Sequence, residues 1–128
     1  MSCDIYLECG HCDSALYEFN ITSNVHGIVD VCILEGALAA GIQPPAAART
    51  ESGQSRHSWA RLAGWTGADA APLLAQASAF AADERNAARL RALEPASGWG
   101  SLDSVRECLE RLAASCAKWP HAVIRTSN

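Results

Sequence analysis

The sequence has few basic residues, and they are scattered along the chain. Ten of its 128 residues are Lys or Arg against 14 Asp or Glu, which leaves a net charge of −4 at pH 7. Proteins that bind nucleic acid usually gather positive charge on one face to neutralise phosphates. The composition therefore argues against a nucleic-acid partner.

The sequence also lacks a long uninterrupted apolar run. Its longest candidate, residues 25–40, contains His26, Asp30 and Glu35, and no basic stretch followed by an apolar one opens the chain. We therefore expect no membrane-spanning helix and no secretory leader, and we place the protein in the cytoplasm. In that compartment its six cysteines are expected to be reduced thiols.

A second metal-binding motif is missing as well. The only C-x-x-C is Cys9 to Cys12, and no H-x-x-x-H accompanies it. Two thiolates at this spacing can face one zinc ion, but a closed structural site needs four ligands. The nearest additional ligands for a zinc site are His11, inside the motif, and His26, on the next segment; further candidates are Cys3, Asp13 and Cys32.

The same thiol pair admits three interpretations: a zinc half-site, plain or structural thiols, and a redox dithiol. Redox pairs sit at the start of a helix, whose dipole stabilises the attacking thiolate. Here the downstream residues 15–22 alternate apolar and polar side chains, which predicts a strand and puts the motif at a hairpin tip. The redox interpretation is therefore the weakest of the three, and the pair by itself does not decide between the others.

The periodicities predict an α+β fold in one domain, residues 1–128. An N-terminal β-hairpin and a C-terminal strand would form a small antiparallel sheet packed against about three helices. The stretch at about 42–58, rich in Pro, Ala, Ser and Gly, is expected to be a flexible loop. We expect strands at 3–9, 15–22 and 121–126 and helices at 24–40, 69–93 and 101–118.

Two local patterns carry further expectations. Trp99 lies between Gly98 and Gly100, so we expect a tight turn that drives the indole into the core. In an extended strand Asn20, Thr22 and Asn24 would share one face at intervals of about 7 Å, which could form a ligand shelf. Backbone capping by these short polar side chains is the simpler interpretation of the second pattern.

Three motifs carry a resemblance to a known family: Asn20-x-Thr22-x-Asn24, Pro95-x-x-Gly98-Trp99-Gly100, and Cys116-x-x-x-Pro120-x-Ala122-x-Ile124. With them the chain resembles a family of small uncharacterised proteins from bacteriophages and bacteria, over most of its length outside 42–65. It has Glu94 and Ser97 where that pattern has asparagine. The resemblance implies a phage or prophage context, the cytoplasm of a bacterial host, and a shared fold, but no activity.

These observations favour a small binding protein that acts on a protein partner, as an inhibitor of a host defence system (anti-CRISPR-like) or an immunity protein. Trp59, Arg61 and Trp65 are the predicted interface residues, because Trp and Arg dominate interface energies. The alternatives are a zinc-stabilised structural module and a thiol-disulfide oxidoreductase that uses Cys9 and Cys12. We assign no catalytic residues and do not expect an enzyme.

Overall fold

A computed structural model describes residues 2–9, 15–22, 25–45, 48–49, 55–56 and 58–127. Strands and helices follow one another in separate runs, as is typical of α+β proteins, and two short 3₁₀ helices in the described residues are labelled η. In chain order the elements are β1 (Ser2–Glu8), β2 (Ala15–Thr22), α1 (His26–Ala40), β3 (Ala48–Arg49), β4 (Ser55–Arg56), η2 (Ser58–Leu62), α2 (Gly67–Ala82), η3 (Glu84–Asn86), α3 (Ala87–Arg91), α4 (Leu102–Lys118) and β5 (Val123–Ser127).

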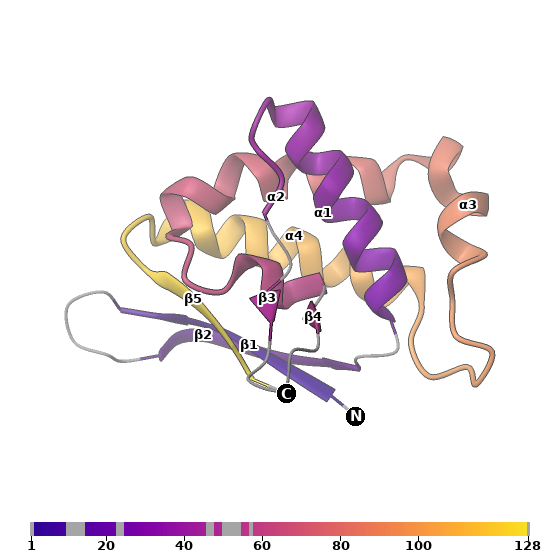
Figure 1. Cartoon of the computed structure of the whole chain (residues 1–128), viewed down its shortest axis with the longest axis horizontal. Coiled ribbons are helices and arrows are strands. Elements are labelled where there is room, and N and C mark those ends of the chain that lie inside the picture. The colour runs from indigo at the N-terminus through magenta and orange to yellow at the C-terminus, as the bar shows by residue number, and fades with distance from the viewer. Residues whose placement is uncertain are drawn as a thin grey trace.

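The larger sheet is antiparallel, with β1 in the middle and the order β2-β1-β5. In its register Leu7 lies opposite Ile124, and both side chains are fully buried together with Ile5. Successive side chains of a strand point to opposite faces, so these residues mark the face that the helices cover. Figure 1 shows the helical layer on that one side of the sheet, which confirms the α+β class.

The helical layer is organised around α2, which packs against both α1 and α4. Gly36 on α1 is buried at the contact with α2, and a Cβ atom there would stand 2.7 Å from the backbone nitrogen of Ala77. Absence of a side chain at this position therefore lets the two helix backbones approach closely. Leu73, Leu74 and Ala77 of α2 complete the fully buried surface at the centre of the layer.

The expectation of one helix over 69–93 is wrong, because α2 ends at Ala82 and the chain turns at Asp83. Asp83 has an extended backbone (φ −72°, ψ 118°), and its carboxylate accepts a hydrogen bond from the backbone N–H of Arg85 at 2.9 Å. An Asp side chain that satisfies the next N–H groups caps a new helix instead of continuing the old one. The side-chain hydrogen bond from Arg85 also holds the pKa of Asp83 below its usual value.

Two helix ends carry caps that suit their residue types. Gly41 ends α1 in the left-handed conformation (φ 70°), and Ser101 begins α4 with a capping box in which Ser104 is the reciprocal partner. Within the expected loop at 42–58, Ala48 pairs with Arg56 in a two-stranded sheet. The remainder of that loop lies partly outside the described residues, and its predicted flexibility stays a prediction.

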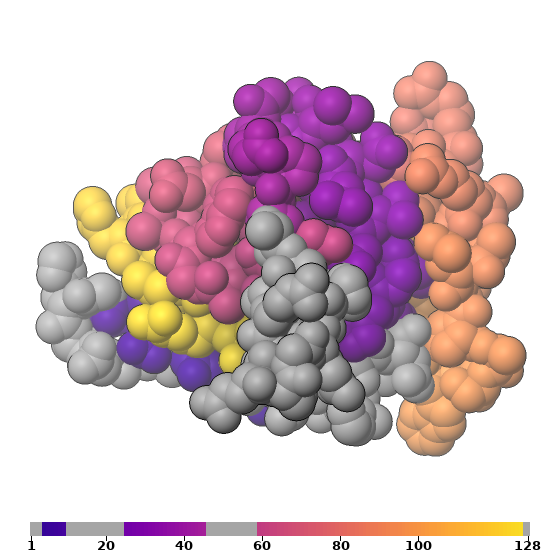
Figure 2. Space-filling view, in the orientation of Figure 1, coloured from indigo at the N-terminus to yellow at the C-terminus, as the bar shows by residue number. Residues whose placement is uncertain are grey.

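The connection between α3 and α4 lies at the periphery of the molecule. In the space-filling view this segment and α3 form a lobe at the opposite end from β5 (Figure 2). Among the described helices, none combines the length and the apolar character that crossing a bilayer requires.

Candidate functional site

The proposed zinc ligands are only partly within the described residues. Cys9 follows β1 and is half-buried, and His26 is the exposed first residue of α1, whereas His11 and Cys12 lie outside the described residues. The described part of the chain contains no group of three or more His, Cys, Asp and Glu side chains placed to hold a metal ion. The zinc site therefore stays a prediction.

The predicted polar shelf is described only in part. Asn20 and Thr22 belong to β2, where they lie opposite Asp4 and Ser2 of β1, but nothing is described of their side chains. Asn24 lies outside the described residues. The backbone at Asn20 and Thr22 is thus extended, as the shelf requires. Ligand binding by these residues stays a prediction.

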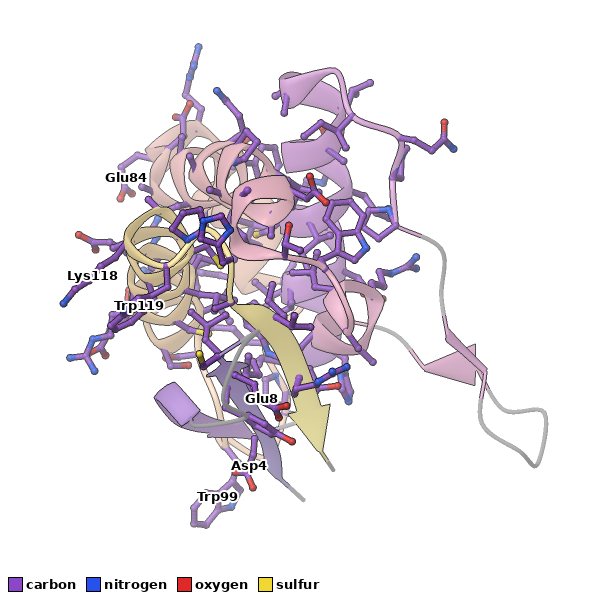
Figure 3. All side chains as sticks on the ribbon, turned by 90° about the vertical axis from the view of Figure 1, so that its left-hand side faces the viewer. Asp4, Glu8, Glu84, Trp99, Lys118 and Trp119 are labelled. Carbon is purple, nitrogen blue, oxygen red and sulfur yellow. The ribbon has the colours of Figure 1, made fainter. Side chains whose placement is uncertain are left out.

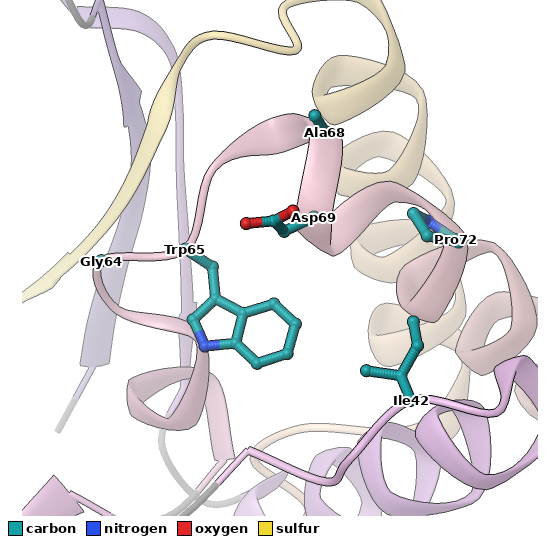
Figure 4. Close-up of a pocket in the computed structure, with 6 residues that line it drawn as sticks. All are labelled: Ile42, Gly64, Trp65, Ala68, Asp69 and Pro72. Carbon is teal, nitrogen blue, oxygen red and sulfur yellow. The ribbon is translucent and has the colours of Figure 1, made fainter.

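The three predicted interface residues have three different environments. Trp59 is 2% exposed and belongs to the core, so its indole is not available to a partner. Arg61 lies between elements, where its Nε donates to Asp30 Oδ1 at 3.1 Å and its Nη1 donates to the Pro45 carbonyl at 2.9 Å. Trp65 is partly exposed and forms one wall of a surface pocket (Figure 4).

Trp99 is the main correction to the sequence analysis. We expected its indole in the core, but it is 72% exposed. Gly98 (φ 78°) and Gly100 (φ 108°) do form the tight turn that the glycines predicted. The turn directs the ring outward, however, and Figure 3 shows Trp99 projecting away from the body of the molecule.

The loop that carries Trp99 is held at both ends. The Glu94 carboxylate accepts a hydrogen bond from the backbone N–H of Leu102 at 2.8 Å, which ties the start of the loop to the first turn of α4. Within the loop, Ser97 Oγ accepts a hydrogen bond from the Trp99 N–H at 3.4 Å. A carboxylate on the N-terminal N–H groups of a helix is electrostatically favourable. The exposed indole is therefore presented by an anchored loop.

The thiols on the helices are core groups. Cys32 on α1 and Cys116 on α4 are fully buried. Burial disfavours the charged thiolate, and it raises the pKa of Cys32 to about 12 and that of Cys116 to about 11. Nearby Arg106 and Arg89 lower the pKa of Cys32 only in part. Neither thiol is suited to act as a nucleophile near neutral pH.

Comparison with known proteins adds no assignment, since no protein-family model, no curated protein and no solved structure matches the chain. The candidate site therefore depends on the geometry of this chain alone. That geometry offers an exposed indole on an anchored loop and a separate pocket beside Trp65.

Sequence reasoning missed the exposure of Trp99, because the local pattern does not decide it. Flanking glycines at positive φ report a sharp turn, and such a turn can direct its central side chain either inward or outward.

Proposed function

We propose that this chain is a small binding protein that inserts the indole of Trp99 into a pocket on a protein partner. The observation that carries the proposal is the 72% exposure of this side chain. Leaving an indole in water forgoes the free energy of burying a large apolar surface. Tryptophan is also the residue type most enriched among those that dominate interface energies.

The surroundings of Trp99 support this interpretation. The base of its loop carries charged side chains in pairs: Arg91 lies 3.7 Å from Glu94 and 3.5 Å from Asp103. Partly exposed ion pairs of this kind add little to stability. An apolar anchor bordered by charged groups is, however, the usual arrangement of a protein interface, in which a polar rim surrounds the buried contact.

The anchored loop supports the proposal on energetic grounds too. Binding costs free energy when a mobile side chain or loop becomes ordered, and a loop that is already held loses less. The hydrogen bond from Leu102 to Glu94 supplies such a constraint before any partner arrives.

We extend the proposal to the biological setting implied by the family resemblance, namely a phage or prophage protein that inhibits a host defence system or confers immunity.

The test compares Trp99→Ala with a matched control, Leu38→Ala. Leu38 on α1 is 74% exposed, so its truncation removes an equally accessible apolar group from another element. The wild-type chain is used to capture proteins from a bacterial lysate, and these candidate partners are identified and purified. The affinity of each candidate partner is then measured for wild type, Trp99→Ala and Leu38→Ala. We expect Trp99→Ala to weaken binding by at least about 30-fold, the effect typical of a dominant interface residue, and Leu38→Ala to bind like wild type.

Equal binding by Trp99→Ala and wild type would overturn the proposal. Circular dichroism of both variants is needed beside the affinities, because a loss of folded protein would imitate a loss of contact. The alternatives of a zinc module and a thiol-disulfide oxidoreductase predict a different result: their properties depend on Cys9 and Cys12 and would survive in Trp99→Ala.

A further inference from the structure

A pocket of about 460 Å³ lies where α1 ends and α2 begins. Trp65 forms one wall and Ile42 with Pro72 the opposite one, while the Asp69 carboxylate faces the space between them (Figure 4). Pockets of this size that combine apolar walls with few polar groups are typical ligand sites. Its volume is enough to take one large side chain or a small molecule.

The walls of the pocket are set by backbone hydrogen bonds. Ile42 follows the left-handed cap at Gly41, and its N–H donates to the Ala37 carbonyl at 2.9 Å. On the other side, the Trp65 carbonyl accepts a hydrogen bond from the Ile124 N–H at 2.8 Å. This bond joins the segment before α2 to β5, so the sheet fixes the position of the Trp65 backbone.

The start of α2 borders the pocket, yet its amide groups are already paired. Gly67 N–H donates to the Ala122 carbonyl at 2.8 Å, and Ala68 N–H donates to the Pro120 carbonyl at 2.9 Å. The N–H of Asp69 donates to Thr66 Oγ1 at 3.2 Å. Free amide groups at a helix start would attract an anion. Here those groups are occupied, so the helix start does not favour an anionic ligand.

The pocket instead offers a negative charge and the hydrogen-bond acceptors of a carboxylate. Asp69 has no ion-pair partner among the residues that the structure describes, and its side chain is exposed. The face of the Trp65 indole adds the electron density that attracts cations.

We propose that this pocket receives the guanidinium group of an arginine side chain on the protein partner, an inference that rests on the proposed function. A guanidinium is planar, stacks on an indole and carries five N–H donors, which suits an aromatic wall beside a carboxylate. A lysine ammonium lacks that flat surface. The net charge of −4 on this chain further favours a basic partner.

The experiment uses N-acetyl-arginine amide as the probe and N-acetyl-citrulline amide as its uncharged analogue of nearly the same shape. Each is titrated at constant ionic strength into the full chain labelled with ¹⁵N, and the indole N–H signal of Trp65 is followed. Loss of that signal in Trp65→Phe assigns it. We expect the arginine probe to shift the signal in a saturable manner, with affinity about fivefold or more above that of citrulline, as a cation–π contact and one ion pair imply.

Asp69→Asn is the decisive variant, and Glu110→Gln is its control. Glu110 is an exposed carboxylate on α4 that does not line the pocket, so the control removes the same unit of charge elsewhere. The arginine preference should disappear in Asp69→Asn and persist in Glu110→Gln. No saturable shift with the arginine probe, equal affinity for citrulline, or equal losses in both variants would each overturn the proposal.

This test is independent of the one for Trp99, because neither the probe nor the signal involves the partner or that loop. If the arginine probe fails while Trp99→Ala still abolishes partner binding, the pocket proposal is wrong and the proposed function stands. If the probe binds but no partner depends on Trp99, the proposed function is wrong, and with it the identification of the guanidinium as a partner's side chain.

Discussion

Arg61 reaches across the helical layer to Asp30: its Nε donates to Asp30 Oδ1 at 3.1 Å and thereby joins η2 to α1, 31 residues apart in the chain. The two side chains are 14% and 22% exposed. A second donation, to the carbonyl of buried Pro45, holds the segment that follows α1. Arg61 is one of the predicted interface residues, and the contacts that the structure describes for it lie within the chain.

Replacing Arg61 by Ala should lower the free energy of unfolding by about 1 to 3 kcal/mol, because a partly buried carboxylate and a buried carbonyl lose a charged donor. Arg61→Lys should recover only part of the loss, since an ammonium cannot make both contacts in the same planar geometry. Urea denaturation of the two variants measures the difference. Equal stability of wild type and Arg61→Ala would contradict this structural role.

Gly36→Ala tests the close approach of α1 and α2. Its Cβ would stand 2.8 Å from both the Cβ of Ala77 and the Leu73 carbonyl oxygen, so the helices would have to separate. Overpacking of this kind costs about 1 to 3 kcal/mol, which outweighs the gain in helix propensity. We expect a lower denaturation midpoint in urea.

Gly27→Ala is the matched control for this prediction, because it also exchanges glycine for alanine in α1. The nearest atom to its Cβ would be Leu93 Cβ at 3.8 Å, an ordinary contact. The variant should be unchanged or more stable by up to about 1 kcal/mol. If both glycine variants lose stability to the same extent, the cause is not the helix contact at Gly36.

Trp59→Ala and Trp99→Ala should lower stability to very different extents. Trp59 is 2% exposed, and its truncation should cost about 3 to 5 kcal/mol because it leaves a cavity in the core. Trp99→Ala should melt within about 2 °C of wild type, since a side chain that is 72% exposed contributes little packing. Thermal unfolding followed by circular dichroism compares the two, and a strongly destabilised Trp99→Ala would mean that the ring packs inside.

The buried thiols should make stability fall in alkaline solution. In the unfolded chain they ionise near 9.0, whereas the folded protein raises the pKa of Cys32 to about 12 and that of Cys116 to about 11. Between these values the unfolded state has released protons that the folded state still holds, so the free energy of unfolding decreases as the pH rises. Below about pH 8 these two groups contribute no pH dependence.

Urea midpoints at about pH 8 and about pH 10 measure this effect, with a Cys32→Ala, Cys116→Ala double variant as the control for other titrating groups. We expect the decrease in midpoint to be larger in wild type than in the double variant. The same decrease in both proteins would assign the alkaline sensitivity to groups other than these thiols.

Local sequence signals determined much of the secondary structure. Alternation predicted strands near β1, β2 and β5. The caps at Gly41 and Ser101 suit their residue types, because a cap depends on a few neighbouring backbone groups. The break at Asp83 shows the limit of periodicity. An apolar stripe continues through it to Leu90, yet the helix ends here. The Asp83 carboxylate accepts from the Arg85 N–H, and the Phe80 and Ala81 carbonyls accept side-chain hydrogen bonds from Asn86 and Arg106.

Tertiary structure alone decided which side chains are available to a partner. Trp59, Trp65 and Trp99 have the same side chain, and no local pattern distinguishes their exposure, because burial depends on the elements that arrive from elsewhere in the chain. The pocket beside Trp65 needs the end of α1, the start of α2 and a hydrogen bond from β5, which are separated by tens of residues. Sequence determined the local turns and caps, whereas contacts between distant segments determined which surfaces remained open, since solvent exposure is a property of the packed chain as a whole.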